Sequence, residues 1–370
     1  MDAWNTYELQ SVCSRLSSGK GIRAKEISET GKYPVYGGNG IRGYTNAYNF
    51  DGECAVIGRQ GANCGNVRFF SGKAYMTEHA VVVCANENNH TRFLSYLLST
   101  MQLGRLSGQS AQPGLAVKTL GIQPVCVPKL DAQKRIASVL GALDDKIALN
   151  QQINKNLEEQ AQKIFNKYFI DVPDIPDGWS EGSLTDIADY LNGLAMQKFP
   201  PMNNADSLPV LKIKELRQGM CDSDSDRCSV EIKPDYIIQD GDVIFSWSGS
   251  LLVDFWCGGD CGLNQHLFKV SSAKYDKWFY YSWTIYHLQA FVRMAADRAT
   301  TMGHIKRDAL EKARVLIPCH DDYVKIGNLL QPLYNLIITN RIENRRLANL
   351  RDALLPRLMS GEIDVSKVEI

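Results

Sequence analysis

The stretch IASVLGALDDKIALNQQINKNLEEQAQKIFNKY, at residues 136–168, decides how this chain is built. Within it, residues suited to a contact between helices recur at steps that alternate four and three. The mean step is the 3.5 residues of a coiled-coil seam rather than the 3.6 residues of a lone surface helix. The members of this ladder are Ile136, Leu140, Leu143, Ile147, Asn150, Asn154, Leu157, Ala161, Ile164 and Tyr168.

A second ladder repeats the first one 190 residues later, and all its rungs keep that offset. Its members are Ile326, Leu330, Leu333, Ile337, Asn340, Asn344, Leu347, Arg351, Leu354 and Leu358. Each ladder predicts a helix of about 33 residues, or roughly 50 Å at 1.5 Å per residue. Two matching seams in one chain favour pairing of the helices with each other, and the repeat indicates a duplicated architecture.

Two asparagines stand in register in each seam. A polar rung costs stability relative to leucine or isoleucine, but it can fix the register and the orientation of the partner helix. With matching helices in one chain, these asparagines could bond across a pseudo-twofold axis, with Asn150 approaching Asn344 or Asn154 approaching Asn340. The alternative is that these rungs mark where the helices diverge and meet solvent.

The two helices differ in charge. Arg351 takes the place that Ala161 has in the first ladder. Further arginines make the second helix basic, namely Arg341, Arg345, Arg346 and Arg357. This basic surface is either a solvated face or a docking face for another subunit.

Turn and proline signals divide the rest of the chain. The segment VPDIPDG at 172–178 cannot continue the first helix because of its prolines. Asp131 is a candidate N-cap of that helix, Gly361 is a candidate stop of the second, and Pro332 indicates that the second helix starts or kinks nearby. The predicted organisation is a globular domain at 1–128, a long helix at 129–172, a second globular domain at 173–318 and a C-terminal long helix at 319–370.

Both globular segments read as short strands, glycine turns and one short helix, with similar motifs in the same order. YPVY at 33–36 is matched by LPVL at 208–211, and GECAVIGRQG at 52–61 is matched by GDVIFSWSG at 241–249. Elsewhere the two segments differ. The prediction is an α+β fold with an internal pseudo-twofold repeat, in which two mixed α/β domains are joined by two long helices packed as an antiparallel coiled coil.

Composition describes a globular chain of 370 residues, with 44% hydrophobic and 22% charged residues. No apolar run reaches the roughly 20 residues of a membrane span, and the N-terminus does not begin a secretory signal. We therefore expect a cytoplasmic protein without membrane contact, whose cysteines are reduced. The formal net charge is zero, which weighs mildly against nucleic-acid binding but allows a local basic groove.

The sequence signatures of catalysis are missing. There is no phosphate-binding Gly-Lys-Ser/Thr loop, dinucleotide fingerprint, Gly-x-Ser-x-Gly elbow or adenine methyltransferase motif. Cys257, Cys261 and His266 could be zinc ligands, but structural zinc sites use four close ligands, so we prefer buried free cysteines. His79 and His266 follow strand-turn positions in the two globular segments. This favours histidines that anchor the turn through a buried hydrogen bond over histidines that contact DNA or phosphate. We predict no catalytic residue, no metal site and no cofactor in this chain.

Polar side chains gather in the glycine-rich loops of both globular segments. Arg, Gln, Asn, Ser and Thr between short strands suit hydrogen bonding to base edges, although they also suit any polar surface. The candidate DNA-binding residues are Arg59, Gln60, Asn63, Gln109, Gln112 and Lys118 in the first segment, and Trp247, Ser248, Gln265, Arg298, Thr300, Thr301, His304 and Lys306 in the second.

An ordered set of short motifs runs through the chain. They are QPGL at 112–115, VCVP at 125–128 and VLIP at 315–318 before the long helices, PDGW at 176–179, and Asn-x-x-x-Asn-x-x-Leu at 150–157 and 340–347. With two globular segments, each followed by a long helix, this set resembles the specificity subunits of type I restriction-modification enzymes over essentially the whole chain.

The resemblance implies a non-catalytic subunit whose globular segments are target recognition domains, each reading one half of a bipartite site in double-stranded DNA. It implies that the helix pair sets the spacing and recruits two methyltransferase subunits, which use S-adenosylmethionine. Restriction/translocase subunits would add cleavage that depends on ATP with Mg. The alternative is a duplicated coiled-coil interaction protein without a DNA role.

Overall fold

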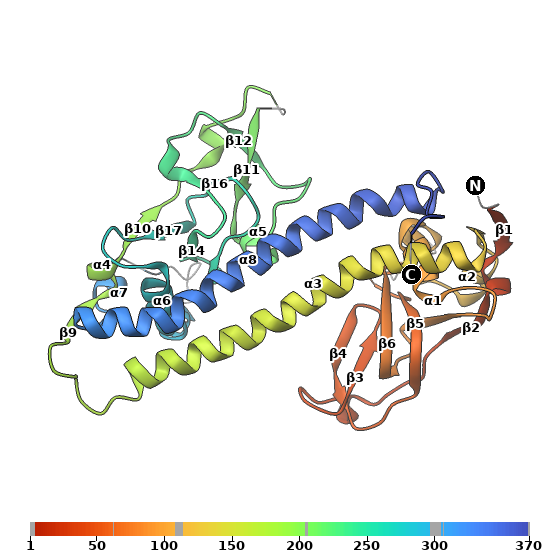
Figure 1. Cartoon of the computed structure of the whole chain (residues 1–370), viewed down its shortest axis with the longest axis horizontal. Coiled ribbons are helices and arrows are strands. Elements are labelled where there is room, and N and C mark those ends of the chain that lie inside the picture. The colour runs from red at the N-terminus through yellow and green to blue at the C-terminus, as the bar shows by residue number, and fades with distance from the viewer. Residues whose placement is uncertain are drawn as a thin grey trace. The chain divides into compact units, whose positions relative to one another are not determined.

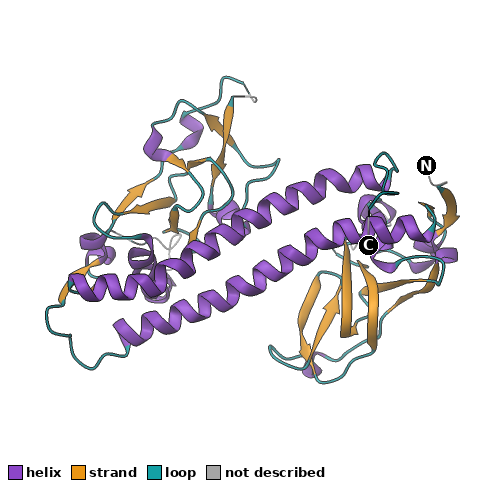
Figure 2. Cartoon of the chain, viewed as in Figure 1, coloured by secondary structure: helices purple, strands orange, loops and turns teal. Residues whose placement is uncertain are grey.

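The computed structural model describes residues 4–61, 63–107, 114–203, 206–296, 305 and 307–368. The chain divides into two compact units, which we call unit 1 (Met1–Asp145 with Ala348–Ile370) and unit 2 (Lys146–Leu347). Each unit contains one globular head and a part of each long helix (Figure 1). We call the heads head 1 (residues 4–128) and head 2 (residues 173–318). In the described parts of the chain, all strands belong to the heads (Figure 2).

The two long helices are α3 (Leu130–Phe165), which continues into the π-helical turn η4 (Asn166–Ile170), and α8 (His320–Met359). In unit 2, Asn150 contacts Asn344 and Asn154 contacts Asn340. Residue numbers thus increase along α3 in the direction in which they decrease along α8, so the two helices run antiparallel. In unit 1, Asp144 pairs with Arg351 in the same register. The predicted antiparallel pairing and the predicted asparagine contacts are therefore confirmed.

The ends of the long helices correct two predictions. Asp131 lies inside the first turn of α3 and not before it, so its assignment as the N-cap is wrong. Its carboxylate still stabilises the helix, because negative charge is favoured near the positive end of the helix dipole.

The second correction concerns Pro332, because α8 begins at His320 and passes through this proline. The start predicted near Pro332 is wrong. Buried Leu330 and Tyr334 anchor the helix on either side of the proline, which is itself exposed. Packing thus offsets the roughly 3 kcal/mol that an interior proline costs.

The stop predicted at Gly361 is confirmed. This glycine has φ +75°, the left-handed conformation that follows many helix ends. Its N–H donates to Leu358 O at 3.3 Å, and Glu362 N–H donates to Arg357 O at 3.0 Å. These two bonds satisfy carbonyl groups of the last turn of α8.

Head 1 is built on a six-stranded sheet with the order β2-β7-β5-β6-β3-β4, and β1 pairs separately with β8. The strands are β1 (Asn5–Glu8), β2 (Cys13–Ser18), β3 (Tyr33–Gly37), β4 (Gly40–Thr45), β5 (Phe50–Gly58), β6 (Val67–Met76), β7 (Ala80–Ala85) and β8 (Pro124–Val127). The helical segments are η1 (Leu9–Val12), η2 (Ala24–Glu26), α1 (Thr91–Thr100), η3 (Leu103–Leu106) and α2 (Val117–Gly121).

The centre of this sheet is buried on both faces. In β5, Ala55 and Ile57 join a core that contains residues of α1 and α3, whereas Cys54 and Val56 join a second core. Alternate side chains of a strand point to opposite faces, so a strand covered on both faces reads as one continuous apolar run. This explains the sequence CAVIG at 54–58.

Head 2 contains three sheets, ordered β10-β17-β14-β15, β12-β11-β16-β13 and β18-β9. The strands are β9 (Ser180–Ser183), β10 (Asp189–Asn192), β11 (Ser207–Leu211), β12 (Arg227–Ser229), β13 (Ile237–Ile238), β14 (Val243–Ser246), β15 (Leu252–Phe255), β16 (Cys261–Leu263), β17 (Leu267–Ser271) and β18 (Arg314–Ile317). The helical segments are α4 (Leu184–Ile187), η5 (Met196–Lys198), α5 (Ile213–Gln218), η6 (Pro234–Tyr236), α6 (Lys277–Ala296) and α7 (Arg307–Glu311).

The two heads share a strand order. β10-β17-β14-β15 in head 2 corresponds to β2-β7-β5-β6 in head 1. In head 1, β3 runs parallel to the end of β6, and in head 2, β11 runs parallel to β16. The single strand β6 of head 1 is therefore divided in head 2 into β15 and β16, with residues 256–260 between them. The heads are repeated in topology and differ in detail.

No helix among the described residues combines the length and the apolar content that crossing a membrane requires.

Candidate nucleic-acid interface

In head 1, three loops meet at one end of the sheet: the glycine turn after β3, the loop after β5 and the turn before β7. Thr77 N–H donates to Tyr36 O, and Arg59 N–H donates to His79 O, each at 2.9 Å. These bonds join the loops through their backbones. The loops approach closely at Gly38, where a Cβ would lie 3.1 Å from His79 O, a tight contact that glycine avoids.

The three loops line a cavity of about 400 Å³. Its wall is formed by Gly38, Asn39, Arg42, Gln60, Gly61 and His79. The imidazole of His79 is 37% exposed, and its Nε2 lies 3.3 Å from Glu78 Oε1. Amide, guanidinium and imidazole groups on one concave surface offer the donors and acceptors that base edges and phosphates require.

Head 2 repeats this turn in its backbone hydrogen bonds. Asn264 N–H donates to Leu211 O at 3.2 Å, as Thr77 N–H donates to Tyr36 O at 2.9 Å. Three more bonds of head 1 have a counterpart in head 2. Ala80 N–H to Thr77 O corresponds to Leu267 N–H to Asn264 O, and Gly19 N–H to Ala80 O corresponds to Gly193 N–H to Leu267 O, all at 3.0 Å. Lys20 N–H to Met76 O, at 2.9 Å, corresponds to Leu194 N–H to Leu263 O, at 3.0 Å.

A glycine permits the turn in each head. A Cβ at Gly19 would lie 2.1 Å from Met76 O, and one at Gly193 would lie 2.2 Å from Asn264 O. Only glycine fits backbones this close. The two heads therefore hold the same turn by the same means, although most of the residues in and around it differ.

In head 2 this end of the sheets also opens into a cavity, of about 640 Å³, that is richer in basic groups. The lining includes Lys212, Lys214, Arg227, Gln265 and His266. His266 Nδ1 lies 3.1 Å from Ser248 Oγ. Further lining residues are Met196, Gln197, Pro200, Pro201, Val210, Ile213, Asp226 and Asn264.

Carboxylates accompany the lysines of this cavity. Lys212 pairs with Asp226, and Lys214 Nζ lies 3.2 Å from Asp222 Oδ2. A hydrogen bond from Gln218 and another from Lys214 lower the pKa of Asp222 to about 2. At neutral pH the carboxylate of Asp222 is therefore ionised. An incoming phosphate would compete with the carboxylates for the lysines.

Some predicted DNA-binding residues line the cavities and others lie beside them. Gln60 and Gln265 line the two cavities. Ser248 is buried, and its Oγ holds His266. Trp247 Nε1 donates to Asn192 Oδ1 at 3.0 Å, and its ring lies 5.6 Å from that of Phe268.

The remaining predicted residues are spread more widely. Arg59 is half-buried, with Nη1 3.4 Å from both Ser18 Oγ and Glu78 O. Asn63 Oδ1 accepts a hydrogen bond from Asn66 Nδ2 at 3.0 Å. Lys118 is exposed on α2, a helix that packs against η1 and β2. It does not line the cavity of head 1. Gln109, Gln112, Arg298, Thr300, Thr301, His304 and Lys306 lie outside the described residues.

Sequence reasoning missed part of the cavity walls. Asn39, Arg42, Lys212 and Lys214 were not candidates, and the two histidines were interpreted as buried turn anchors. The expected burial is wrong, because both histidines are only partly buried and line a cavity, although His266 does bond to the buried hydroxyl of Ser248. The signal that could have found them is the matched position: His266 lies 187 residues after His79, before equivalent strands.

Cys257 and Cys261 are buried free thiols, as predicted. Burial raises the pKa of Cys257 to about 11, so this thiol stays protonated at neutral pH. Within the described parts of the chain, no three His, Cys, Asp or Glu side chains converge as metal ligands.

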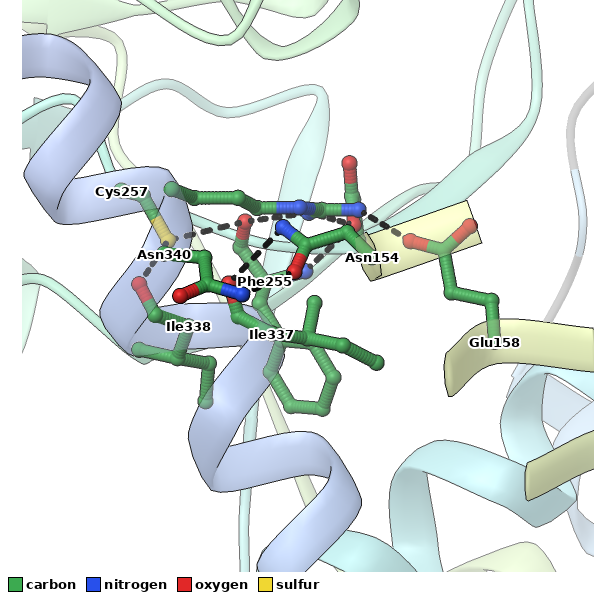
Figure 3. Close-up of polar contacts among 9 residues, drawn as sticks. Asn154, Glu158, Phe255, Cys257, Ile337, Ile338 and Asn340 are labelled. Carbon is green, nitrogen blue, oxygen red and sulfur yellow. Dashed lines mark hydrogen bonds and ion pairs between the residues drawn. The ribbon is translucent and has the colours of Figure 1, made fainter. Parts of the chain in front are cut away.

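The seam of the helix pair contains a symmetric asparagine network. Asn340 Nδ2 donates to Asn154 Oδ1 at 2.8 Å (Figure 3), and Asn150 Nδ2 donates to Asn344 Oδ1 at 2.9 Å. The accepting asparagine of each pair donates in turn to a backbone carbonyl of the facing helix. Asn154 Nδ2 donates to Ile337 O at 3.2 Å, and Asn344 Nδ2 donates to Ile147 O at 3.4 Å. A shift of 190 residues converts each bond into its counterpart. The network thus has a local twofold symmetry.

The other seam residues are at least partly buried. Leu140, Leu330 and Ile337 are buried, and Leu143, Ile147, Leu157, Leu333 and Leu347 are half-buried.

Arginines of α8 bind head 2. Arg345 donates to both oxygens of Asp240 and to Cys257 O, each at 2.7 Å. Arg341 donates to Asp254 Oδ1 at 2.5 Å and to Glu158 Oε1 at 2.9 Å. Burial acts to raise the pKa of Asp240, but the hydrogen bonds from Arg345 leave it below its ordinary value. These two arginines form neither a solvated face nor an empty docking face, because they attach the helix to its own head.

Comparison with known proteins identifies the family. The type I restriction modification DNA specificity domain matches residues 1–159 and 176–350. The chain is 42% identical over 134 residues to the EcoprrI specificity subunit of Escherichia coli. The aligned region covers 35% of this chain and 33% of that protein. It is 28% identical over 305 residues to the MjaIX specificity subunit of Methanocaldococcus jannaschii. That aligned region covers 75% of this chain and 70% of the relative.

A solved structure shares the fold. The S subunit of a type I restriction-modification system from M. genitalium superposes with a TM-score of 0.68 over 96% of both chains, at 14% identity. The duplicated match, the two heads and the antiparallel helix pair lead to one conclusion. The chain belongs to the family of type I restriction-modification DNA specificity subunits.

Proposed function

We propose that this non-catalytic specificity subunit recognises a bipartite site in double-stranded DNA, with one head for each half-site. The observation that carries this proposal is the duplicated turn, which ends at His79 in head 1 and at His266 in head 2. Both turns line a polar cavity at the same end of matching sheets. Equivalent frames with different side chains suit two readers of different sequences.

The helix pair is the spacer in this proposal. Two rigid helices would convert half-site separation into a fixed length, much as subunit geometry does in dimeric DNA-binding proteins. The asparagine network supports this role, because four hydrogen bonds in the seam oppose sliding of α3 along α8. The ion pairs of Arg341 and Arg345 support it by joining head 2 to α8.

The partners follow from family membership. We propose that the helix pair recruits two methyltransferase subunits, which bind S-adenosylmethionine, and that restriction/translocase subunits supply cleavage with ATP and Mg. The assembly would act in the cytoplasm. The net charge of zero supports a shared interface, because phosphate contacts dominate affinity and the partners would supply many of them.

A selection experiment tests the proposal. The full chain is incubated with 40-base-pair duplexes of random sequence, and the bound duplexes are sequenced. We expect two short specified blocks separated by an unspecified spacer of constant length. Enrichment of one contiguous block, or no enrichment, would contradict a bipartite reader and favour a coiled-coil interaction protein without a DNA role.

A further inference from the structure

The turns at residues 77–79 and 264–266 share the histidine and differ at their first two positions. The first reads Thr-Glu-His, and the second reads Asn-Gln-His. Four backbone hydrogen bonds match between them, so the histidines occupy equivalent positions. The shared residue is therefore a property of the frame, while its neighbours belong to the individual heads.

The backbone and the side chain of the first residue supply most of the hydrogen bonds that hold each turn. His79 N–H bonds to Thr77 Oγ1 at 3.4 Å, and His266 N–H bonds to Asn264 Oδ1 at 3.2 Å. These side chains and the backbone bonds stabilise the turns. The imidazole of His79 has a glutamate at its Nε2, and that of His266 has Ser248 at its Nδ1. The common feature of the two rings is that they face a cavity.

The remaining polar groups of the two cavities differ in kind. Head 1 presents Asn39, Arg42 and Gln60. Head 2 presents Lys212, Lys214, Arg227, Gln197 and Gln265. Two half-sites with different sequences require different base-reading groups, but they have the same sugar–phosphate backbone. Phosphate contacts position a protein on DNA, and base contacts specify the sequence.

We infer that His79 and His266 are equivalent contacts to the DNA sugar–phosphate backbone, one in each head, and that the differing side chains around them read the bases. This inference rests on the proposed function. Each histidine would fix the position of its head on the duplex. Gln60 and Arg42 would then meet base edges in one half-site, and the groups of head 2 would meet those of the other.

The test uses the full chain, the same random duplexes and four histidine variants. We expect His79→Ala and His266→Ala each to weaken binding about tenfold for every duplex, which is the loss of one hydrogen bond to a charged group, and to leave both enriched blocks unchanged. His79→Gln, which keeps a hydrogen-bond donor, should recover part of the affinity. His320→Ala, at an exposed histidine that lines neither cavity, should bind as the parent does.

Gln60→Ala serves as the contrasting variant. It should change the base preference in one block only, with a discrimination loss of about tenfold. A changed block in His79→Ala or His266→Ala would overturn the inference, because it would identify a base contact. Unchanged affinity in both would also overturn it. If the parent chain enriches no sequence at all, the proposed function fails first, and thermal unfolding of each variant separates lost contacts from lost folding.

Discussion

The two heads are attached to the same pair of helices with opposite charge patterns. In unit 1 the head supplies the base, since Arg92 of α1 donates to Asp145 of α3 at 2.9 and 2.7 Å. In unit 2 the helix supplies the base, since Arg345 of α8 donates to Asp240 of head 2 at 2.7 Å. The asparagine positions of the seam are the same in both long helices. The ion pairs between helix and head differ, because the arginine comes from the head in unit 1 and from the helix in unit 2.

The two helices also differ in polarity at the equivalent pairs Asp144–Arg351 and Tyr334–Ala161. In unit 1, Asp144 accepts hydrogen bonds from Arg351 at 2.8 Å and from Tyr96 OH at 2.5 Å. The matching residues in unit 2 are Tyr334 and Ala161, which lie in an apolar core. One end of the repeat is thus polar and the other apolar. A head grafted onto the other end would meet the wrong partners.

The largest expected effect is at the joint of head 2. Asp240→Ala removes a carboxylate that is 26% exposed. It leaves Arg345 with Cys257 O and no charged partner, and it leaves Gly259 N–H without its acceptor, so we expect a loss of about 3 kcal/mol in the free energy of unfolding of unit 2. Tryptophan fluorescence measures it in urea, because five of the six tryptophans lie in residues 179–283.

The matched variant in unit 1 is Asp145→Ala. Its carboxylate is 69% exposed, so the loss should be at most about 1 kcal/mol, measured by circular dichroism. Equal losses at the two joints would contradict the difference between them.

The second effect concerns the seam that the units share. Asn154→Ala leaves the buried amide of Asn340 without its acceptor, and we expect a loss of about 2 kcal/mol by urea denaturation. The double variant Asn154→Leu with Asn340→Leu should recover this stability, because it removes both polar partners together. A double variant less stable than the single one would show that the amides stabilise the seam and do more than fix its register.

The smallest effect compares the two equivalent pairs Asp144–Arg351 and Tyr334–Ala161. Arg351→Ala should cost about 1 kcal/mol, because the pair with Asp144 is about one-third exposed and Asp144 keeps its bond to Tyr96. Tyr334→Phe should cost about 0.5 kcal/mol, since it loses only the hydroxyl contact with Ser282. Thermal unfolding would record both, and the opposite order would contradict this account.

The frame could be predicted from sequence because it is periodic. The 3.5-residue step specified the seam, and the repeated asparagine positions indicated pairing about a pseudo-twofold axis, while the family resemblance implied the antiparallel direction. Pro332 was misleading, because local propensity ignores the buried side chains that hold a helix through a proline. The arginines of α8 were ambiguous for a similar reason: their partners Asp240 and Asp254 are about 90 to 105 residues away in the chain.

The candidate interface was only partly predictable. Glycine-rich loops indicated Gln60 and Gln265, which line the cavities. Asn39 and Lys212 escaped notice, because their place depends on β3 and β11 lying beside strands from elsewhere in each head. The place of the two histidines depends on backbone bonds between distant segments, from Thr77 to Tyr36 and from Asn264 to Leu211, which no local pattern specifies.

The central claim is that the helix pair sets spacing and the heads set sequence. Its most direct test inserts one heptad in α3 after Asp145 and one in α8 after Leu347, at the two points where the chain passes from one unit to the other. Seven residues add about 10 Å of helix, or about three base pairs of DNA, and keep the seam in phase. Selection from random duplexes should then return the same two blocks with a spacer about three base pairs longer. Altered blocks at an unchanged spacing would contradict the account.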